Sequence, residues 1–136
     1  MRHETRQDAA GGIVRLLNET KDYPAETITA GSEVDTTLRA LADHYAEIGQ
    51  PGSALEIYQE LFRKIMASNP DPENDLLNSV YVSRLHTSLA MLLRRMGRGD
   101  QAVPLETGRL ELWLHWNRKL PNNPFVHRQL EAARLP

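Results

Sequence analysis

The chain of 136 residues contains no cysteine. This absence excludes disulfide frameworks, zinc sites built from thiolates and cysteine nucleophiles. The chain also lacks any apolar run near the roughly 20 residues that a membrane-spanning helix needs, and the polar residues 1–8 are not followed by an apolar signal-peptide segment. We therefore expect a soluble, cytoplasmic protein that does not interact with membranes.

Patterns that indicate catalysis are missing as well. We find no phosphate-binding loop, no Ser/His/Asp order and no paired-carboxylate spacing. No two histidines stand four residues apart, so the pattern of a zinc-binding helix is absent. The histidines are His3, His44, His86, His115 and His127. We expect no enzyme, no metal and no cofactor.

The small net charge of −2 hides an uneven distribution. Residues 1–83 carry 7 basic and 14 acidic side chains, and residues 84–136 carry 9 basic and 4 acidic ones. A basic half attracts acidic partners or nucleic acid, and opposite halves of two copies attract each other. The densest basic clusters are only pairs, such as Arg94-Arg95 and Arg118-Lys119. A solvated surface is therefore favoured over nucleic-acid binding.

Apolar residues recur at three- and four-residue steps along most of the chain, which is typical of amphipathic helices. The pattern predicts helices over residues 32–50, 51–68, 72–97 and 100–120, with Asp71 as the N-cap of the third. The expected core stripe of that third helix is Leu77, Tyr81, Leu85, Leu89, Leu92 and Met96. Because no segment alternates like a half-buried strand, the predicted fold is all-α.

The prediction divides the chain into an N-terminal segment, 1–31, and one helical domain, 32–136. The segment would hold a short helix capped by Asp8, although Gly11 and Gly12 weaken it by about 1 kcal/mol each. The apolar residues of that helix are Ile13, Val14, Leu16 and Leu17. The domain would end in a closing helix over 124–135. In the fourth helix, Trp113 and Trp116 share a face, and we expect core packing or an interface anchor there.

The sequence repeats itself at an offset of 48 residues. The offset places Leu41-Ala42 on Leu89-Ala90 and Ile48-Gly49 on Met96-Gly97. Small residues let paired helices approach closely, and glycine permits the tight turn between them. The sequence therefore predicts two copies of one helix-turn-helix unit.

The first copy reads Leu38-x2-Leu41-Ala42-x2-Tyr45, then Ala54-x3-Tyr58, then Pro70. This pattern resembles the tetratricopeptide repeat (TPR), with a longer second helix than the family has. The resemblance implies a short right-handed stack of antiparallel helical hairpins, with repeat one at about 35–70 and repeat two at about 75–121. The packing signature of the two copies comprises Leu38, Leu41, Ala42, Tyr45, Gly49, Ala54, Tyr58, Leu89, Ala90, Leu93, Gly97 and Ala102.

A looser resemblance rests on the segments ALEIYQELFRKIMASNPDPEND and YVSRLHTSLAMLLRRMGRGDQAV. They look like the elongated repeats found C-terminal to some bacterial serine/threonine protein kinases. The kinase motifs themselves are absent, because the chain has no glycine-rich loop, no His-Arg-Asp and no Asp-Phe-Gly. The resemblance thus implies a regulatory or docking module of a bacterial signalling system.

In the TPR family, the polar faces of the leading helices line a concave groove that receives peptides. The resemblance places in such a groove Arg39, Asp43, Glu47, Arg84, Thr87, Ser88, Met91, Arg94 and Arg95. Arginines bind carboxylates or phosphates through paired hydrogen bonds, which suits an acidic or phosphorylated peptide. The alternative is a solvated face on which Arg39 and Asp43 form an i,i+4 pair worth about 0.2–0.5 kcal/mol.

Three functions stay open at this point. The leading one is a peptide-binding scaffold; the others are nucleic-acid or acidic-partner binding through the basic half, and small-molecule sensing between helices. Two repeats are fewer than the roughly three that solenoids usually need for stability. Flanking segments or a second copy of the chain must therefore cover the exposed faces, which favours a homodimer.

Overall fold

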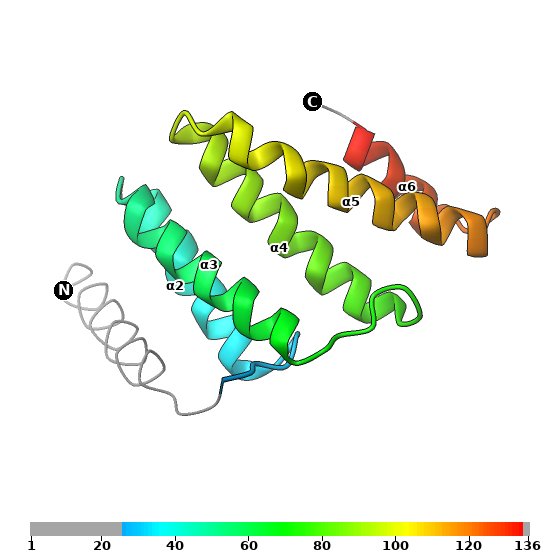
Figure 1. Cartoon of the computed structure of the whole chain (residues 1–136), viewed down its shortest axis with the longest axis horizontal. Coiled ribbons are helices and arrows are strands. Elements are labelled where there is room, and N and C mark those ends of the chain that lie inside the picture. The colour runs from blue at the N-terminus through cyan, green and yellow to red at the C-terminus, as the bar shows by residue number, and fades with distance from the viewer. Residues whose placement is uncertain (1–25, 135–136) are drawn as a thin grey trace, which may run out of the picture. The chain divides into compact units, whose positions relative to one another are not determined.

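The computed structural model describes residues 26–134, and this part of the chain is all-α, with five helices and no strand (Figure 1). The fold class predicted from the sequence is therefore confirmed. The helices are α2 (Glu33–Glu47), α3 (Pro51–Ala67), α4 (Leu76–Arg95), α5 (Gly99–Lys119) and α6 (Pro124–Arg134). The helix predicted over residues 8–17 lies outside the described residues. None of the five described helices combines the length and the apolarity that crossing a bilayer requires.

The chain divides into two compact units, Met1–Asn69 and Pro70–Pro136. In the first unit, α2 and α3 form a hairpin. Ser32 is the N-cap of α2, because its Oγ accepts a hydrogen bond from the backbone N of Asp35 at 3.3 Å. The apolar faces of the two helices make the core of this unit, which consists of Ile28, Leu38, Leu41, Ala42, Ala54, Leu55, Ile57, Tyr58, Leu61 and Ile65.

The turns after α2 and α4 have the same backbone geometry, 48 residues apart. Gly49 and Gly97 adopt φ values of 78° and 75°, a left-handed conformation that glycine accommodates without a steric cost. The next backbone N reaches back to a carbonyl near the helix end in both turns, from Gln50 to Tyr45 and from Arg98 to Leu93, each at 2.8 Å. Both turns are thus Schellman motifs, and the sequence repeat is also a repeat of local structure.

Helix α4 begins at Leu76 with Asp75 as its N-cap, so the predicted start at residue 72 with Asp71 as cap is wrong. The backbone N of Asp75 bonds the carbonyl of Asp71 at 2.8 Å and closes a turn ahead of the helix. The carbonyl of Pro72 accepts a hydrogen bond from Nε1 of Trp116 on α5 at 2.7 Å. The local turn and the tertiary bond from Trp116 together hold residues 71–75 outside the helix.

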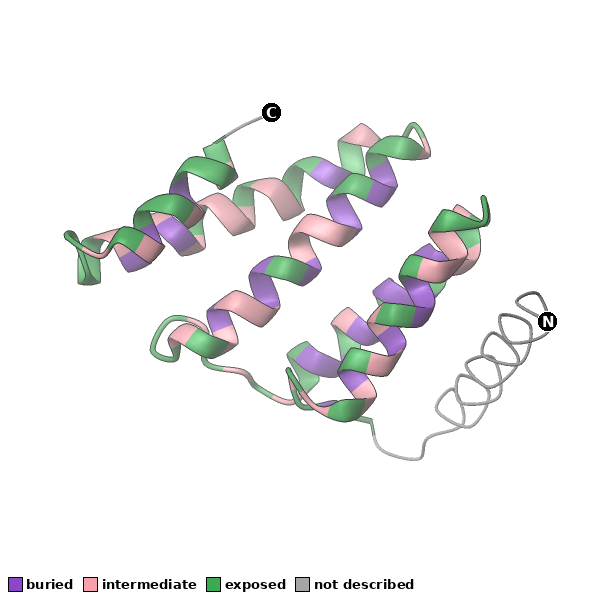
Figure 2. Cartoon of the chain, turned by 180° about the vertical axis from the view of Figure 1, so that it is seen from behind, coloured by how far each residue is buried: buried purple, intermediate pink, exposed green. Residues whose placement is uncertain are grey.

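The second unit has its core between α4, α5 and α6. Trp113 and Trp116 are buried with Val126 and Leu130, so both indoles pack in the core. The ring of Trp113 meets that of Phe125 edge-on, with centroids 6.1 Å apart. Exposed positions recur along each helix between buried ones (Figure 2), and those on α2, α3 and α4 supply the surfaces considered next.

Candidate functional site

Arg39, predicted in a binding groove, is engaged within the first hairpin. Its Nε donates a hydrogen bond to Oδ1 of Asp35 at 2.7 Å, and this ion pair spans one turn of α2. Asp35 is only 1% exposed, and its Oδ2 also accepts from the backbone N of Gly31 at 2.7 Å. A buried carboxylate needs such partners, so Arg39 stabilises the start of α2.

Asp43 is engaged as well, because Oδ1 of Asp43 accepts a hydrogen bond from the hydroxyl of Tyr58 on α3. This bond ties the two helices of the hairpin together. Glu47 stands exposed in the last turn of α2. Two of the three groove residues predicted on α2 therefore bind within their own unit.

On α4, two of the predicted groove residues are similarly occupied. Oγ1 of Thr87 donates to the carbonyl of Ser83 at 2.9 Å. Arg94 holds Glu106 of α5 through two bonds, from Nε at 2.7 Å and from Nη2 at 2.5 Å. The hydrogen bond from Arg94 lowers the pKa of Glu106, and this pair links α4 to α5 at the surface.

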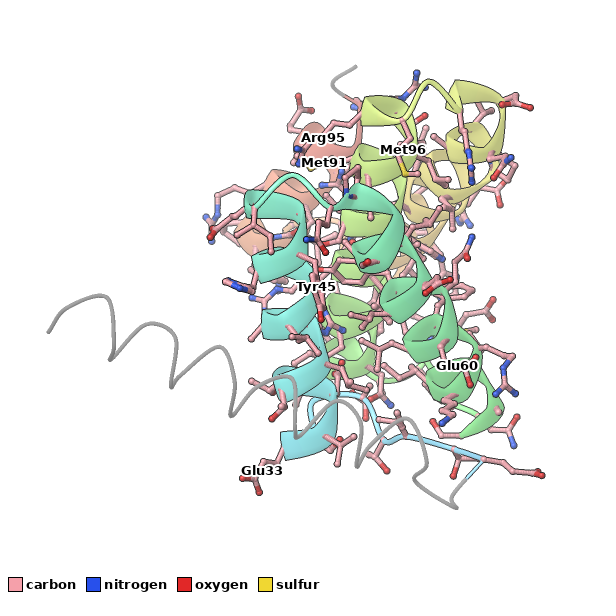
Figure 3. All side chains as sticks on the ribbon, turned by 90° about the vertical axis from the view of Figure 1, so that its left-hand side faces the viewer. Glu33, Tyr45, Glu60, Met91, Arg95 and Met96 are labelled. Atoms are coloured by element: carbon pink, nitrogen blue, oxygen red, sulfur yellow. The ribbon has the colours of Figure 1, made fainter. Side chains whose placement is uncertain are left out.

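The other predicted residues of α4 share one exposed stripe. Arg84, Met91 and Arg95 are exposed and Ser88 is half-buried, and steps of four, three and four residues align them. Leu77 lies seven residues before Arg84 on the same face and is 60% exposed. We call the face formed by Leu77, Arg84, Ser88, Met91 and Arg95 the α4 stripe. Met91 is 62% exposed (Figure 3 labels it beside Arg95).

Leu77 was expected in the core stripe of its helix, and that expectation is wrong. Four-residue steps turn a helix by about 40° each, so a run from Leu77 to Leu89 winds about 120° around the axis. Leu85 and Leu89 are buried, whereas Leu77 comes out on the exposed side of the helix, in line with Arg84 and Met91.

Among the described residues, the two arginines of the α4 stripe have no acidic partner. Helix α4 contains no aspartate or glutamate. Within residues 26–134, Arg84 and Arg95 form no ion pair. The stripe therefore presents two guanidinium groups with apolar side chains on the same helix face.

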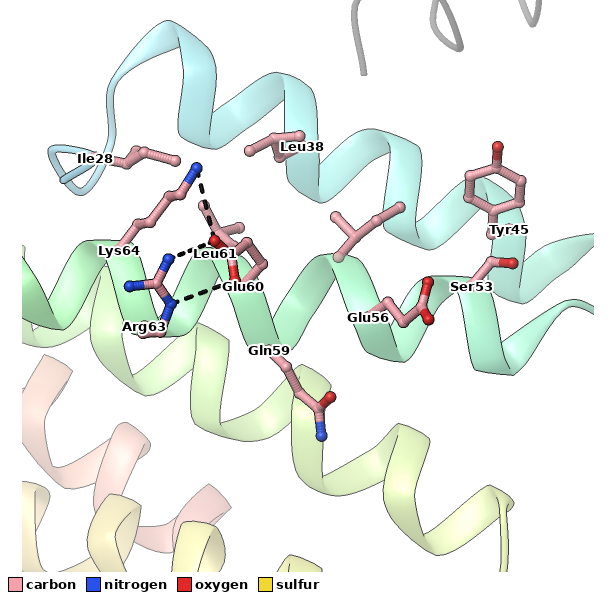
Figure 4. Close-up of a pocket in the computed structure, with 11 residues that line it drawn as sticks. Ile28, Leu38, Tyr45, Ser53, Glu56, Gln59, Glu60, Leu61, Arg63 and Lys64 are labelled. Carbon is pink, nitrogen blue, oxygen red and sulfur yellow. Dashed lines mark hydrogen bonds and ion pairs between the residues drawn. The ribbon is translucent and has the colours of Figure 1, made fainter. Parts of the chain in front are cut away.

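A second surface, which the sequence did not predict, is a groove of about 740 Å³ on the α2–α3 hairpin (Figure 4). Its floor is apolar and consists of the buried side chains Leu38, Ile57 and Leu61. Ile28 and Lys64 close one end. Polar side chains form the remaining wall, namely Tyr45, Ser53, Glu56, Gln59, Glu60 and Arg63. We call this surface the hairpin groove; it is large enough for a small ligand as well as for part of a peptide.

The charged wall of the hairpin groove is largely paired. Glu60 accepts a hydrogen bond from Nη2 of Arg63 at 2.5 Å and lies 3.7 Å from Nζ of Lys64. The bond from Arg63 is the main cause that lowers the pKa of Glu60. The apolar floor is already buried, because Leu38, Ile57 and Leu61 are 7%, 9% and 0% exposed. Its sequence signal is Ile57, which joins Leu61 and Lys64 at three- and four-residue steps.

Half-buried His86 on α4 packs against α5. The imidazole of His86 lies against Gly108, where a Cβ would stand 3.6 Å from Cε1 of His86. Burial lowers the pKa of His86, and the nearby charge of Arg109 lowers it further. Burial also lowers the pKa of Arg109. Among the described residues, no three histidine or carboxylate side chains gather in a way that would hold a metal ion.

Comparisons with protein-family models, with curated proteins and with solved structures find no match to this chain. The exposed surfaces of the described helices are thus the features from which function is inferred.

Proposed function

We propose that this protein is a non-enzymatic helical module of the TPR type that binds an acidic peptide segment along the α4 stripe. The observation that carries the proposal is the pair of exposed arginines, Arg84 and Arg95, on either side of the exposed Met91. A guanidinium group binds a carboxylate or a phosphate through two parallel hydrogen bonds. The flexible methionine side chain adapts to a range of apolar partners.

The spacing of the two arginines defines the ligand. Eleven residues of helix separate Arg84 from Arg95 by about 16 Å. An extended peptide covers that distance with about five residues, whereas a helical peptide needs about eleven. The best ligand therefore carries two acidic groups at one of these spacings, with an apolar residue between them for Met91.

An acidic peptide suits this surface better than nucleic acid does. Non-specific nucleic-acid binding uses many phosphate contacts and aromatic side chains on which bases stack. The α4 stripe offers two arginines, and its exposed large uncharged side chains, Leu77 and Met91, are not aromatic, whereas Tyr81 on the same face is half-buried. Apolar side chains between charges match an amphipathic peptide.

The Schellman turns at Gly49 and Gly97 support the TPR-type repeat, because they recur at the same offset as the sequence pattern. In this proposal the two hairpins stack as TPR units do, and the module docks a partner within a bacterial signalling system. A homodimer would provide one way to cover the ends of so short a stack.

A peptide array tests the proposed function. Each peptide carries two glutamates around a central leucine, and the spacing between the glutamates is varied along the array. We expect retention to peak at the extended or the helical spacing. The double variant Arg84→Ala/Arg95→Ala should weaken binding at least about tenfold, because it removes two charge-assisted contacts.

The matched control is Arg118→Ala/Arg128→Ala, which removes the same charge from exposed positions on α5 and α6. This control should bind the array peptides as the unmodified protein does. Equal weakening of peptide binding by both double variants would contradict specific binding along the α4 stripe. Displacement of the peptides by a single-stranded oligonucleotide, with steep salt dependence, would instead identify nucleic acid as the ligand.

A further inference from the structure

One exposed face of α2 carries a stripe of negative charge. Steps of three and four residues align five exposed side chains on this face, namely Glu33, Thr36, Ala40, Asp43 and Glu47. We call this face the α2 stripe. It contains three carboxylates and no basic residue, and Figure 3 labels Glu33 at its start.

Two of these carboxylates have no cationic partner among the described residues, because Glu33 and Glu47 form no ion pair there. Asp43 is held on the stripe, since its Oδ1 accepts the hydrogen bond from the hydroxyl of Tyr58. The α2 stripe is therefore the acidic counterpart of the α4 stripe, whose two arginines lack an acidic partner.

The two stripes also agree in spacing. Ala40 lies seven residues from Glu33 and seven from Glu47. Met91 lies seven residues after Arg84, and seven helical residues are about 10 Å long. When the two helices lie side by side with the small Ala40 against the long Met91, a glutamate therefore comes to Arg84 in either direction.

Arg95 meets carboxylates in both arrangements as well. It lies four residues beyond Met91, about 6 Å along the helix. With the helices parallel, this position falls between Asp43 and Glu47. With the helices antiparallel, it falls about 5 Å from Glu33 along the axis, a distance that the long arginine side chain spans.

We propose that the acidic partner of the α4 stripe is the α2 stripe of a second copy of this chain. This inference rests on the proposed function, because it names the ligand of the same stripe. The charged side chains of both stripes are exposed within the single chain, so each is open to a partner from outside. Complementary charges at matched spacings favour a second copy as that partner. Since each copy offers both faces, copies join head to tail or pair reciprocally as a dimer.

Charge reversal in the full chain, followed by sedimentation velocity, tests the inference. We expect the unmodified protein to self-associate at about 50 mM salt and to dissociate at about 500 mM salt, where exposed charges are screened. Glu33→Arg/Glu47→Arg should lower the association constant at least about tenfold, because repulsion replaces attraction. Arg84→Glu/Arg95→Glu should do the same. An equimolar mixture of these two double variants should associate again, because each reversed stripe then meets its opposite charge on the other variant.

The matched control is Glu56→Arg/Glu111→Arg, which makes the same change of charge at exposed positions on α3 and α5. It should associate as the unmodified protein does. Glu47→Arg alone is a milder variant, because a positive charge in the last turn of α2 suits the helix dipole, and it should weaken association in part. Circular dichroism verifies that each variant stays folded, and recovery in the mixture requires folded partners.

Self-association that survives reversal of the α2 stripe, or that the mixture does not restore, would overturn the inference. A monomer under all conditions would do so too. The peptide array gives a separate readout, because Glu33→Arg/Glu47→Arg keeps the α4 stripe and should still bind the array peptides. Array binding without self-association would remove this inference and leave the proposed function standing. Failure of the unmodified protein to retain any array peptide would contradict the proposed function itself.

Discussion

Nε1 of Trp113 on α5 donates a hydrogen bond to Oγ of Ser83 on α4 at 2.8 Å, and both side chains are buried. One turn further along α5, Nε1 of Trp116 bonds Oγ of Ser79 at 2.6 Å. The single donor of Trp113 is therefore satisfied by a serine of the neighbouring helix, and that of Trp116 is shared between Ser79 and the carbonyl of Pro72. These bonds set the alignment of α4 along α5 in the second unit.

Replacing Ser83 with alanine leaves the indole N–H of Trp113 buried without its acceptor. We expect Ser83→Ala to lower the free energy of unfolding by about 1–3 kcal/mol, the cost of an unpaired buried donor. Urea denaturation followed by tryptophan fluorescence measures this loss. In a Trp113→Phe background the donor is absent, so the same serine substitution should cost much less. Equal costs in both backgrounds would show that the bond is not the cause.

The ion pair between Asp35 and Arg39 should contribute more to the free energy of unfolding than the exposed ion pair between Glu60 and Arg63 does. Arg39→Ala removes the partner of a buried carboxylate, and we expect the free energy of unfolding to fall by about 3 kcal/mol. Arg63→Ala removes an ion pair with Glu60 that is even shorter, at 2.5 Å, but both of those side chains are exposed, so the loss should be far smaller. The midpoints of urea denaturation compare the two variants. A larger loss in Arg63→Ala would refute the role given to burial.

Two glycines should respond to alanine in opposite directions. Gly108 lies inside α5, where a Cβ meets His86 at an ordinary contact distance of 3.6 Å. We expect Gly108→Ala to stabilise the protein by about 0.5–1 kcal/mol, because alanine loses less backbone freedom in a helix. Gly97 has a positive φ, so Gly97→Ala should destabilise it by about 1 kcal/mol. Thermal unfolding distinguishes these outcomes, and a gain at both positions would be inconsistent with the left-handed turn.

His86 should make stability depend on pH. Its pKa in the folded protein lies below the ordinary value of 6.5, first because of burial and then because of Arg109. The unfolded chain therefore binds a proton at a higher pH than the folded one. The contribution of His86 to stability is full above about pH 6.5 and falls as the pH drops toward the lowered pKa of the folded state.

Urea denaturation at about pH 7.5 and about pH 5.5 measures this dependence. We expect the unmodified protein to lose more stability between these values than His86→Gln does, because glutamine does not titrate. The variant retains the other histidines, so their contributions cancel in the comparison. An equal change in the free energy of unfolding between the two pH values in both proteins would exclude His86 as the source of the pH dependence.

Much of the local structure could be predicted from the sequence. Ser32 caps α2, and Gly49 ends the same helix, because capping and left-handed turns depend on a few neighbouring residues. The start of α4 was misplaced, since the turn before it is held by Trp116, more than 40 residues further along the chain. A contact between residues so far apart in the chain produces no recognisable pattern in the sequence near either of them.

The candidate surfaces were predicted less completely than the helices. Asp43 and Arg94 have the residue types of a binding face, yet Tyr58 and Glu106 on neighbouring helices already bond them. The α4 stripe retains exposed members of the predicted set. The hairpin groove was missed because its floor residues look like ordinary core positions of an amphipathic helix.

The sequence by itself determined the helical class, the two glycine turns and the 48-residue repeat. Helix periodicity and turn conformation depend on residues that are close together in the chain. Only the tertiary structure decided which polar side chains bond within the protein and which remain exposed for a partner. That choice depends on how closely neighbouring helices bring their side chains together. The same residue type is therefore structural at Arg39 and exposed at Arg84.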